Sequence, residues 1–422
     1  MTFEASGAKA VAEITRRAAQ RLRAGHLWVY RSDVVRMTPG EDGAVAGGAL
    51  VSVVDGRGIP LGTALYSDAS EIVLRVVSRQ AGVRRAEYLE EVRVRMRSAI
   101  RLREQVAGEA FAGSGETDAC RVTFSEADEL PGIVVDRYGD LVVVQLLTQG
   151  TAQDDVRAVL AEVLAEQDWV RTVVERPDAR ARELEHLEPA PEGPLYVRAG
   201  CEATLQTVFG INGVRFHYDA EAGQKTGAFL DQRLNYAAAA QWAGAATAGR
   251  ALDVCTYQGG FALHLARVCE RVTGVDASRA ALEVADRNLA LNPGGKAKVD
   301  WIEADAFDLL REFAELGERY DAVVLDPPAF AKTKRAVEGA KRGYKELNLR
   351  AIKMIAPGGT LVTCSCSQHV GMEEFAGVVR SAAEDAGRRM QMLEMRGAAP
   401  DHPAILTLPE TSYLKCLICR VE

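Results

Sequence analysis

Four aspartates in the second half of the chain lie at the ends of short apolar runs: Asp253, Asp276, Asp305 and Asp326. A single aspartate in such a place is often only a helix cap. Four in succession instead indicate a ligand site, because the carboxyl ends of parallel strands meet at one edge of a sheet. At that edge, Asp276 could accept hydrogen bonds from ribose hydroxyls, and Asp305 could bind an adenine amino group.

Two glycines, Gly259 and Gly260, follow the first of these runs and precede a helical pattern. Adjacent glycines let a ligand approach the backbone beside a helix N-terminus, although they also serve as a simple tight turn. Their spacing does not match the GxGxxG fingerprint of dinucleotide-binding proteins. A nicotinamide oxidoreductase is therefore a remote alternative.

From residue 201 onward, short apolar runs alternate with helical patterns. The predicted strands are residues 251–255, 271–275, 300–303, 322–325 and 360–364, and the helices between them include residues 261–268 and 278–291. This order predicts an α/β domain with a parallel, doubly wound sheet.

Two blocks precede this domain. Residues 1–83 combine a basic helix with short β-rich runs, and Asp55-Gly-Arg-Gly58 is a hairpin signal, so we predict a small β-barrel. Residues 84–200 show a helix, two strands, a helix and a strand, which predicts an α+β domain that ends in a Pro- and Glu-rich linker. We therefore predict three domains, at residues 1–83, 84–200 and 201–422.

The net charge of −8 argues against an overall basic nucleic-acid binder, so only local clusters could contact phosphates. Such clusters occur at residues 16–36, 84–103 and 332–345, although for any one of them a solvated helix face is the simpler explanation. No apolar stretch approaches twenty residues. We therefore predict neither a membrane span nor a secretory signal, and the cytoplasm is the default compartment.

The eight cysteines are too sparse for a disulfide framework, and we expect reduced thiols. Cys416 and Cys419 form a lone CxxC in an alternating apolar run near the end of the sequence. This pattern favours buried thiols on a strand over metal ligands, and no metal site is predicted.

The glycine pair, Asp276, Asp305 and the Asp326-Pro-Pro motif occur in the order that is found in the class I S-adenosylmethionine-dependent methyltransferases, which this chain resembles. The resemblance implies a Rossmann-like α/β domain with a seven-stranded sheet whose last strand is antiparallel. It also implies that S-adenosylmethionine lies across the first three strands, and that the CxxC run is the last strand.

A narrower resemblance covers nearly the whole chain. Residues 125–140, 223–233, 326–332, 342–348, 363–367 and 409–415 are similar to segments of the PUA-domain-containing large-subunit rRNA cytosine-C5 methyltransferases. This resemblance implies a PUA RNA-binding barrel, a central α+β domain, free or partly assembled 23S rRNA as the substrate, and a homodimer. Gln258 and Ala228 depart from the family pattern, and both neighbour the expected cofactor.

The strand-end positions and the resemblance together predict the contacts of S-adenosylmethionine. These are Thr226, Gly227, Phe229, Asp231, Asp253, Tyr257, Gly259, Gly260, Asp276, Ala277, Asp305, Ala306 and Asp326.

Methylation of cytosine C5 requires activation, because C5 is a poor nucleophile. A thiolate that adds to C6 makes C5 nucleophilic, and the C5 proton later leaves as the thiol is expelled. Cys364 resembles the family nucleophile, with a buried structural thiol as the alternative interpretation. Cys366 is the alternative nucleophile, since every second residue of an extended chain faces the same side.

Asp326 is predicted to hold the N3 and amino edge of the cytosine. Ala329 stands where some relatives have a second cysteine that they use in releasing the product, so no acceptor is assigned for the C5 proton.

Two other functions remain open at this point. A guanine methyltransferase would need no thiol, and a non-catalytic RNA-binding protein would need neither Cys364 nor the acidic strand ends. RNA contacts are expected from residues 332–345 and from a barrel face with Trp28 and Tyr30, since aromatic side chains can stack on bases. For Trp28, core packing is an equally good explanation.

Overall fold

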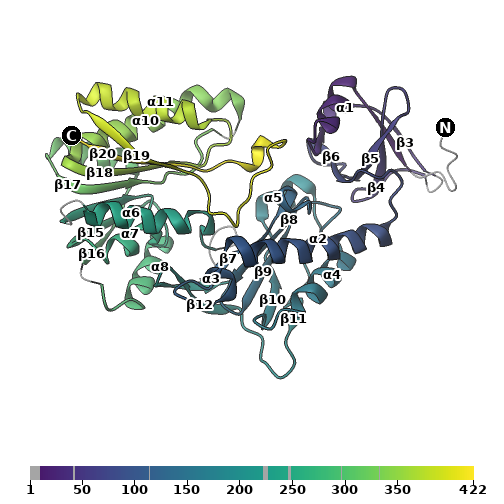
Figure 1. The fold of residues 1–422 in the computed structure, drawn as a ribbon, viewed down its shortest axis with the longest axis horizontal. Coiled ribbons are helices and arrows are strands. Elements are labelled where there is room, and N and C mark those ends of the chain that lie inside the picture. Colours follow the sequence, from purple (N-terminus) through teal and green to yellow (C-terminus); the bar gives the residue numbers. More distant parts are fainter. Residues whose placement is uncertain are drawn as a thin grey trace.

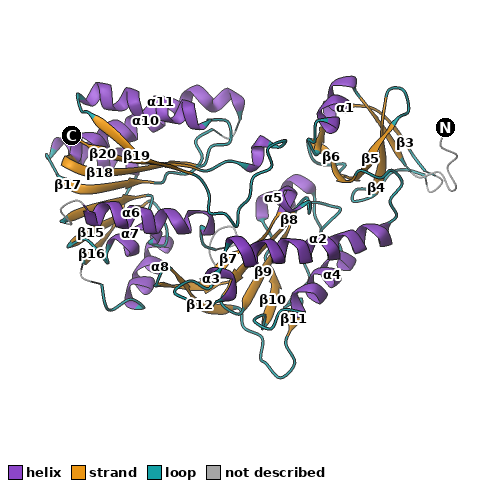
Figure 2. Ribbon diagram, in the orientation of Figure 1, coloured by secondary structure: helices purple, strands orange, loops and turns teal. Residues whose placement is uncertain are grey.

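The computed structural model describes residues 10–40, 43–113, 115–221, 227–245, 249–295, 297–331 and 333–422. The described chain forms three bodies that follow one another along the sequence (Figure 1). Their order and their secondary structure (Figure 2) confirm the predicted architecture of a small β domain, an α+β domain and a large α/β domain.

The first body is a six-stranded sheet in the order β2-β6-β5-β4-β1-β3, and it encloses a core of its own that includes Ala12, Val29 and Val51. The predicted hairpin is present, because the Asp55 carboxylate accepts hydrogen bonds from the amides of Arg57 and Ile59, at 2.9 and 3.0 Å. The elements are β1 (Val11–Ile14), α1 (Arg16–Arg23), β2 (Trp28–Tyr30), η1 (Arg31–Asp33), β3 (Val34–Thr38), β4 (Leu50–Asp55), β5 (Pro60–Tyr66) and β6 (Ile72–Ser78).

The second body is a five-stranded sheet in the order β11-β10-β9-β8-β7, covered by the long helix α2 and by α4. Its elements are α2 (Arg85–Val106), α3 (Glu109–Ala112), β7 (Ala119–Phe124), η2 (Ser125–Asp128), β8 (Ile133–Tyr138), β9 (Leu141–Leu146), α4 (Asp154–Ala165), β10 (Thr172–Glu175), α5 (Ala179–Glu185) and β11 (Tyr196–Val197).

The arginines of α2 are largely engaged in ion pairs. Arg93 contacts Glu162 on α4 at 2.8 Å, and Arg97 contacts Glu166 at 2.5 Å. Arg103 is fully buried and pairs with Asp128 at 2.5 Å. The basic stretch at residues 84–103 therefore helps to hold helices and loops together, a structural role that differs from both the solvated helix face and the phosphate contacts considered for it.

A hairpin that the sequence analysis did not separate lies between the second and third bodies. It consists of β12 (Gln206–Ile211) and β13 (Val214–Asp219), joined at Asn212 and Gly213. Both turn residues have positive φ, of +50° and +77°, which is the backbone conformation that Asn-Gly adopts in tight hairpins. This hairpin supplies Phe209, Ile211 and Phe216 to the cavity described below.

The third body contains the predicted seven-stranded sheet, in the order β16-β15-β14-β17-β18-β20-β19. The first five strands pair in parallel, whereas β20 pairs antiparallel with both β18 and β19. Cys416 and Cys419 are buried in β20, as predicted for the last strand.

The elements of this body are η3 (Leu230–Gln232), α6 (Arg233–Ala245), β14 (Arg250–Val254), α7 (Gly260–Leu265), β15 (Arg271–Asp276), α8 (Arg279–Ala290), β16 (Lys298–Glu303), α9 (Ala306–Glu315), β17 (Tyr320–Leu325), η4 (Lys334–Ala336), α10 (Val337–Met354), β18 (Ile355–Ser365), α11 (Met372–Ala386), β19 (Met390–Arg396), η5 (Pro409–Thr411) and β20 (Lys415–Val421).

The loop between β19 and β20 leaves the sheet and extends toward the other two bodies (Figure 1). Thr407 on this loop donates a hydrogen bond to the carbonyl of Gly25 in the first body, at 2.9 Å. Asp401 accepts a hydrogen bond from the amide of Arg121 in the second body, also at 2.9 Å. One loop of the third body therefore contacts both other bodies before it returns to the sheet at Lys415.

Among the described residues, no helix combines the length and the apolar character that crossing a bilayer requires. All eight cysteines lie within the described ranges and carry free thiols.

Candidate functional site

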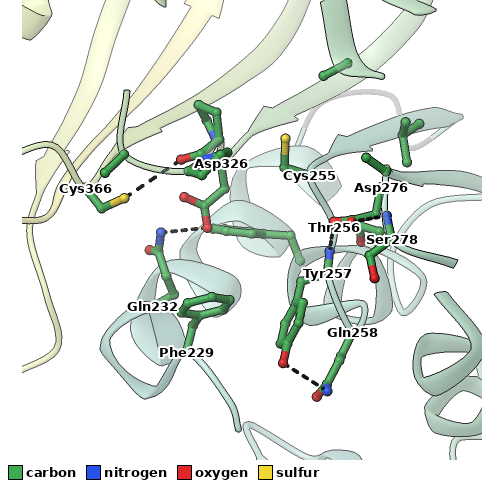
Figure 3. Close-up of a pocket in the computed structure, with 18 of the residues that line it drawn as sticks. Phe229, Gln232, Cys255, Thr256, Tyr257, Gln258, Asp276, Ser278, Asp326 and Cys366 are labelled. Carbon is green, nitrogen blue, oxygen red and sulfur yellow. Dashed lines mark hydrogen bonds between the residues drawn. The ribbon is translucent and has the colours of Figure 1, made fainter. Parts of the chain in front are cut away.

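A cavity of about 570 Å³ lies at the carboxyl ends of β14, β15, β16 and β17 (Figure 3). This volume is within the range of sites for small molecules and cofactors. The hairpin β12–β13 and the residues just before β20 complete its wall. Of the residues predicted from the sequence, the following line the cavity: Phe229, Asp231, Tyr257, Gly260, Asp276, Ala277, Asp305, Ala306 and Asp326.

At one end of the cavity, the Asp276 carboxylate is fixed by backbone amides. Its Oδ2 accepts a hydrogen bond from the amide of Tyr257, and its Oδ1 accepts one from the amide of Ser278, both at 2.9 Å (Figure 3). Cys255 and Tyr257 have φ of +64° and +51°, a strained conformation for residues other than glycine. The loop after β14 is therefore held in an unusual shape that directs one amide at this carboxylate.

Asp305 serves as a helix cap and as part of the cavity wall at the same time. Its Oδ1 accepts hydrogen bonds from the amides of Phe307 and Asp308, at 2.8 and 3.2 Å, at the start of α9. Asp305 can therefore cap a helix and bind a ligand at the same time, because a carboxylate has enough lone pairs for both tasks.

Asp253 does not line the cavity. It is fully buried beneath the loop, where its Oδ2 accepts hydrogen bonds from the Thr256 hydroxyl at 2.5 Å and from the Ala262 amide at 2.8 Å. Its Oδ1 has no hydrogen-bond partner among the described residues, and burial raises the pKa of this carboxyl to about 7. Asp253 therefore stabilises the loop after β14 through hydrogen bonds from its buried side.

The two glycines differ in their surroundings. Gly259 has φ of +86° and precedes α7, and it is absent from the cavity wall. Gly260 lies in the wall, and a Cβ at this position would come within 2.6 Å of the Tyr236 ring. A glycine is therefore required at 260 by close packing, and at 259 by the left-handed backbone.

The segment before α6 approaches the same loop. The Tyr257 hydroxyl donates a hydrogen bond to the carbonyl of Gly227 at 3.2 Å, and the rings of Tyr257 and Phe229 meet edge to face at 5.2 Å. Gly227 itself does not line the cavity, and Thr226 lies outside the described residues. Ala228 and Gln258, the two departures from the family pattern, both line the cavity.

At the opposite end, Gln232, Asp326 and Cys366 lie together (Figure 3). Gln232 donates a hydrogen bond from Nε2 to Oδ2 of Asp326, at 3.0 Å. The Cys366 Sγ lies 3.9 Å from the carbonyl oxygen of Pro327, the residue after Asp326. Asp326 and the thiol therefore border the same part of the cavity.

A chain of hydrogen bonds fixes the orientation of the Gln232 amide. Arg396 donates from Nε to Oδ1 of Asn235 at 2.8 Å, and Asn235 donates from Nδ2 to Oε1 of Gln232 at 2.6 Å. Because a guanidinium can only donate, each amide in the chain must accept on its oxygen and donate from its nitrogen. The chain therefore ends with an N–H group of Gln232 directed at the Asp326 carboxylate.

The two cysteines near the end of β18 lie in different surroundings. Cys364 is fully buried in the sheet opposite Cys416, and it does not line the cavity. A hydrogen bond with Cys416 together with burial raises the pKa of Cys364 well above its usual range. The ladder with β20 ends at Ser365, so Cys366 has left the regular strand, is partly exposed and lines the cavity. The predicted nucleophile thus lies behind the wall, and the alternative one lies in it.

Several cavity residues were missed in the sequence. Tyr413 is one of them, and its hydroxyl donates a hydrogen bond to Oδ2 of Asp231 at 2.5 Å. Residues 409–415 were singled out as a family-like segment, which was a usable signal for Tyr413. Gln232 belongs to another family-like segment, residues 223–233. Its position in the cavity wall beside Asp326 is shown only by their hydrogen bond, because the two residues are far apart in the sequence.

The expected RNA-contacting residues are only partly accessible. Trp28 is half-buried, and its Nε1 donates a hydrogen bond to Glu126 of the second body at 2.9 Å, so it contributes to an interface between the two bodies. Lys334 and Arg335 are exposed, whereas Lys332 lies outside the described residues. Arg16 and Arg17 on α1 are also exposed.

The composition of the wall fits S-adenosylmethionine. Asp231, Asp276, Asp305 and Asp326 line the cavity, and no lysine, arginine or histidine among the described residues does so. Carboxylates suit a cofactor that carries a sulfonium and an ammonium group, whereas they would repel the phosphates of a dinucleotide. Asp276, with both oxygens already fixed by amides, could accept hydrogen bonds from two ribose hydroxyls, and the side chain of Phe307 could provide an apolar surface for adenine.

Two family models match the chain. The model of the S-adenosylmethionine-dependent methyltransferases matches residues 199–420, and a model of PUA-like domains matches residues 13–79.

Curated relatives match over almost the whole length. The ribosomal RNA large subunit methyltransferase I of Shewanella amazonensis is 36% identical over 400 residues, which cover 94% of this chain and 95% of the relative. The protein of that name in Pseudoalteromonas translucida is 36% identical over 95% of this chain and 96% of its own length. The one in Klebsiella pneumoniae is 34% identical over 94% of each chain.

The fold is also that of a solved structure. SMU.776, described as a methyltransferase and crystallised in complex with SAH, superimposes with a TM-score of 0.76. The superposition covers 97% of this chain and 99% of the other at 19% identity. At this level of identity, the likeness shows that the whole arrangement of the fold is shared.

Proposed function

This chain belongs to the family of S-adenosylmethionine-dependent methyltransferases, and we propose that it methylates C5 of a cytosine in large-subunit (23S) ribosomal RNA. The relatives that match over nearly the full length are ribosomal RNA large subunit methyltransferases, which supports this substrate. The observation that carries the choice of C5 is a thiol, Cys366, in the cavity wall beside Asp326. Methylation of an exocyclic amine or of a guanine N7 would have no use for that thiol.

We propose Cys366 in place of Cys364 as the nucleophile. An attacking thiolate must reach C6 of the base, and Cys366 is partly exposed to the cavity whereas Cys364 is enclosed in the sheet. The Sγ of Cys366 forms a bond with C6, and the electron pair of the C5–C6 double bond becomes available at C5. S-adenosylmethionine supplies an electrophilic methyl group when it is bound. The C5 proton then leaves to water, its bonding electrons restore the C5–C6 double bond, and the bond between Sγ and C6 breaks with Cys366 departing as the thiolate.

Asp326 is proposed to accept a hydrogen bond from the amino group of the cytosine and to share a proton with N3, which gains negative charge when the thiolate adds to C6. Its Oδ2 already accepts a hydrogen bond from Gln232, so the carboxylate is held in one orientation before the base arrives. Preorganised polar groups of this kind contribute to catalysis because they need no reorganisation during the reaction. The acids Asp276 and Asp305 are proposed to hold the ribose and adenine of the cofactor, and Asp253 and Gly259 to shape the loop beneath it.

RNA binding is proposed to involve the first body and η4, the short helix just before α10. Arg16 and Arg17 on α1 and the pair Lys334 and Arg335 are exposed cations, which suits contacts to phosphates. A cytosine within a duplex would have to be flipped out to reach the cavity, unless the rRNA is free or only partly assembled. The homodimer implied by the family resemblance and the cytoplasmic location expected from the sequence stay predictions, and sedimentation and fractionation would test them.

The product of the reaction tests this function directly. Purified protein is incubated with methyl-labelled S-adenosylmethionine and 23S rRNA from a strain that lacks the gene, and the RNA is then digested to nucleosides. We expect the label in 5-methylcytidine, with no label when 16S rRNA replaces 23S rRNA. Label in a methylated guanosine would contradict the C5 assignment, and a lack of transfer to any rRNA would contradict the substrate.

A further inference from the structure

A buried lysine next to the proposed nucleophile has no role in the reaction as described so far. Lys415 is the first residue of β20 and is only 5% exposed. Its Nζ donates hydrogen bonds to the carbonyl oxygens of Ser367 and Tyr413, both at 2.6 Å. Within the described residues, no carboxylate lies within ion-pair distance of this ammonium group. A buried ammonium without a counter-charge is costly, so its presence calls for an explanation.

The position of Lys415 places it under the segment that carries Cys366. Lys415 pairs with Ser365 in the antiparallel ladder between β18 and β20, and it binds the carbonyl of Ser367. Cys366 is the residue between these two contacts. Two of the three N–H groups of the ammonium are used by carbonyls, which leaves one for a neighbour.

The segment itself is rigid enough to hold this arrangement. The Ser367 hydroxyl lies 2.8 Å from the hydroxyl of Tyr344, and it accepts a hydrogen bond from the amide of Ala331 at 3.1 Å. Ser367 is therefore tied to α10, to the loop after β17 and to β20 at once. Cys366 is held at a defined place relative to both Lys415 and Pro327.

We infer that Lys415 is a positioning residue that stabilises the thiolate form of Cys366 with its buried positive charge. This inference rests on the proposed function, in which Cys366 attacks cytosine C6. A thiol is a much weaker nucleophile than a thiolate, and nearby cations are a common means of increasing the thiolate fraction. An ammonium in a water-poor environment is well suited to this task, because its field is less screened there than in water.

The electrostatic surroundings agree with this role. Burial lowers the pKa of Lys415 to about 8, and the charge of Cys366 acts in the opposite direction. The other titratable groups that face Cys366 are Tyr344 from α10, Tyr413, and Asp326 across the cavity. Burial raises the pKa of both phenols, so they stay neutral at pH 7. A negative charge on Asp326 disfavours the thiolate, and a nearby cation is needed to offset it. Arg121 of β7 forms an ion pair with Asp136 at 2.8 Å, and its charge also acts on Tyr413 and Asp231. Lys415 is therefore the cation that faces this thiol from within the described chain.

Thiol reactivity as a function of pH tests the inference without RNA. Full-length wild type and Lys415→Met, Lys415→Gln and Lys415→Arg variants are treated with iodoacetamide from pH 5 to 10, and alkylation at each cysteine is followed by peptide mass spectrometry. Cys201, which is exposed in a loop, is the internal reference in every sample. Titration with S-adenosylmethionine confirms that each variant is folded.

In wild type, we expect the alkylation of Cys366 to have a lower pH midpoint than that of Cys201. Lys415→Met should raise the Cys366 midpoint by one pH unit or more, which means about tenfold slower alkylation at pH 7, and leave Cys201 unchanged. Lys415→Gln keeps a donor for one carbonyl and should behave like the methionine variant, whereas Lys415→Arg should keep most of the effect. This pattern would show that the positive charge of Lys415 affects Cys366, and that its hydrogen bonds to backbone carbonyls alone do not explain the effect.

Two results would overturn the inference: equal Cys366 midpoints in wild type and in the two neutral variants, or a wild-type Cys366 midpoint at or above that of Cys201. The second measurement needs no variant, so it holds even if the substitutions prevent folding. Failure of the proposed function shows itself differently, as the absence of 5-methylcytidine with wild type. The alkylation experiment would then still report whether Lys415 acts on Cys366.

Discussion

The two ends of the cavity are built in different ways. At the end proposed to bind the cofactor, called the cofactor end below, Asp276 and Asp305 sit on successive turns between a strand and a helix, and each is fixed mainly by amides within a few residues or in the adjacent turn. At the end proposed to bind the substrate, called the substrate end below, Gln232, Asp326 and Cys366 come from three distant segments, and Arg396 on an edge strand orients Gln232 through Asn235. The first end follows from local structure, and the second exists only when several elements pack together.

This difference has a consequence for function. A substitution at the cofactor end should remove one contact and leave its neighbours in place, so affinity should fall while the chemistry stays possible for the bound molecules. A substitution at the substrate end should disturb groups that depend on one another, so the rate should fall more than the affinity. The predictions below test this contrast, from the largest expected effect to the smallest.

The largest effect is expected at Cys366. Cys366→Ser should reduce methyl transfer at least about a thousandfold, because a serine hydroxyl is not ionised at neutral pH and does not add to C6. Cofactor affinity should be unchanged, as measured by calorimetry. With RNA that contains 5-fluorocytosine, wild type should form a covalent complex, since the fluorine does not leave as a proton does, and Cys366→Ser should form none.

Cys364→Ser is the matched control, since it changes the same atom two residues away in the same segment. It should still form the trapped complex, with at most a modest loss of stability from the polar hydroxyl in the sheet. Trapping that disappears in Cys364→Ser and persists in Cys366→Ser would restore the original assignment. Full methylation by both variants would exclude covalent catalysis and favour the guanine alternative.

The next largest effect is expected at Gln232. Gln232→Leu removes the donor to Asp326 and should lower kcat by about 10- to 100-fold, which corresponds to the loss of one hydrogen bond to a charged group. The dissociation constant of S-adenosylmethionine should change by less than about threefold. Asn235→Ala, which breaks the chain one step earlier, should have the same kind of effect with a smaller size. A fall in cofactor affinity without a change in kcat would show that Gln232 acts on the cofactor, and would contradict its assignment to the substrate end.

At the cofactor end, Asp276→Ala should weaken the binding of S-adenosylmethionine by about 10- to 100-fold, as expected for the loss of hydrogen bonds to a carboxylate. The value of kcat at saturating cofactor should change much less, which is the reverse of the Gln232 result. Asp305→Ala should have a smaller effect, because that carboxylate is exposed and is also used to cap α9. Calorimetry and steady-state kinetics measure both quantities, and unchanged affinity in Asp276→Ala would remove this residue from the site.

The smallest effect concerns the stability of the loop beneath the cofactor. The pKa of Asp253 is about 7 in the folded protein, above its value of 3.8 in an unfolded chain. The folded state therefore holds this proton more tightly, and the contribution of Asp253 to stability is present below pH 3.8 and is lost as the pH rises through 7.

Asp253→Asn cannot titrate, so the stability of wild type relative to this variant should decline between pH 4 and 8. We expect the difference in the free energy of unfolding to change by an amount on the order of 1 kcal/mol. This is less than the full pKa shift of Asp253 implies, because the surrounding structure relaxes around a buried carboxylate and reduces the cost of ionising it. Urea unfolding at several pH values measures the difference. A difference that is constant with pH would show that Asp253 is ionised throughout.

Much of the cofactor end could be predicted from the sequence for a physical reason. Strand-end acids and glycines act through the turns in which they lie, so their spacing along the chain already determines their geometry. Asp276, Asp305 and Gly260 were found in this way and line the cavity. Asp253 was also selected, but the carboxylate of a strand residue can turn into the sheet, and burial beneath the loop is not visible in a sequence pattern.

At the substrate end, the sequence determined the residue types, and the tertiary structure decided which of them meet. Residues 363–367 supply two cysteines with almost the same local context, and period-two alternation alone does not distinguish them. The antiparallel pairing with β20 does so, because the ladder encloses Cys364 opposite Cys416 and ends at Ser365, which leaves Cys366 in the cavity wall. The same pairing brings Lys415 beneath the segment that carries this thiol, a position that depends on strand register and that the local sequence does not encode.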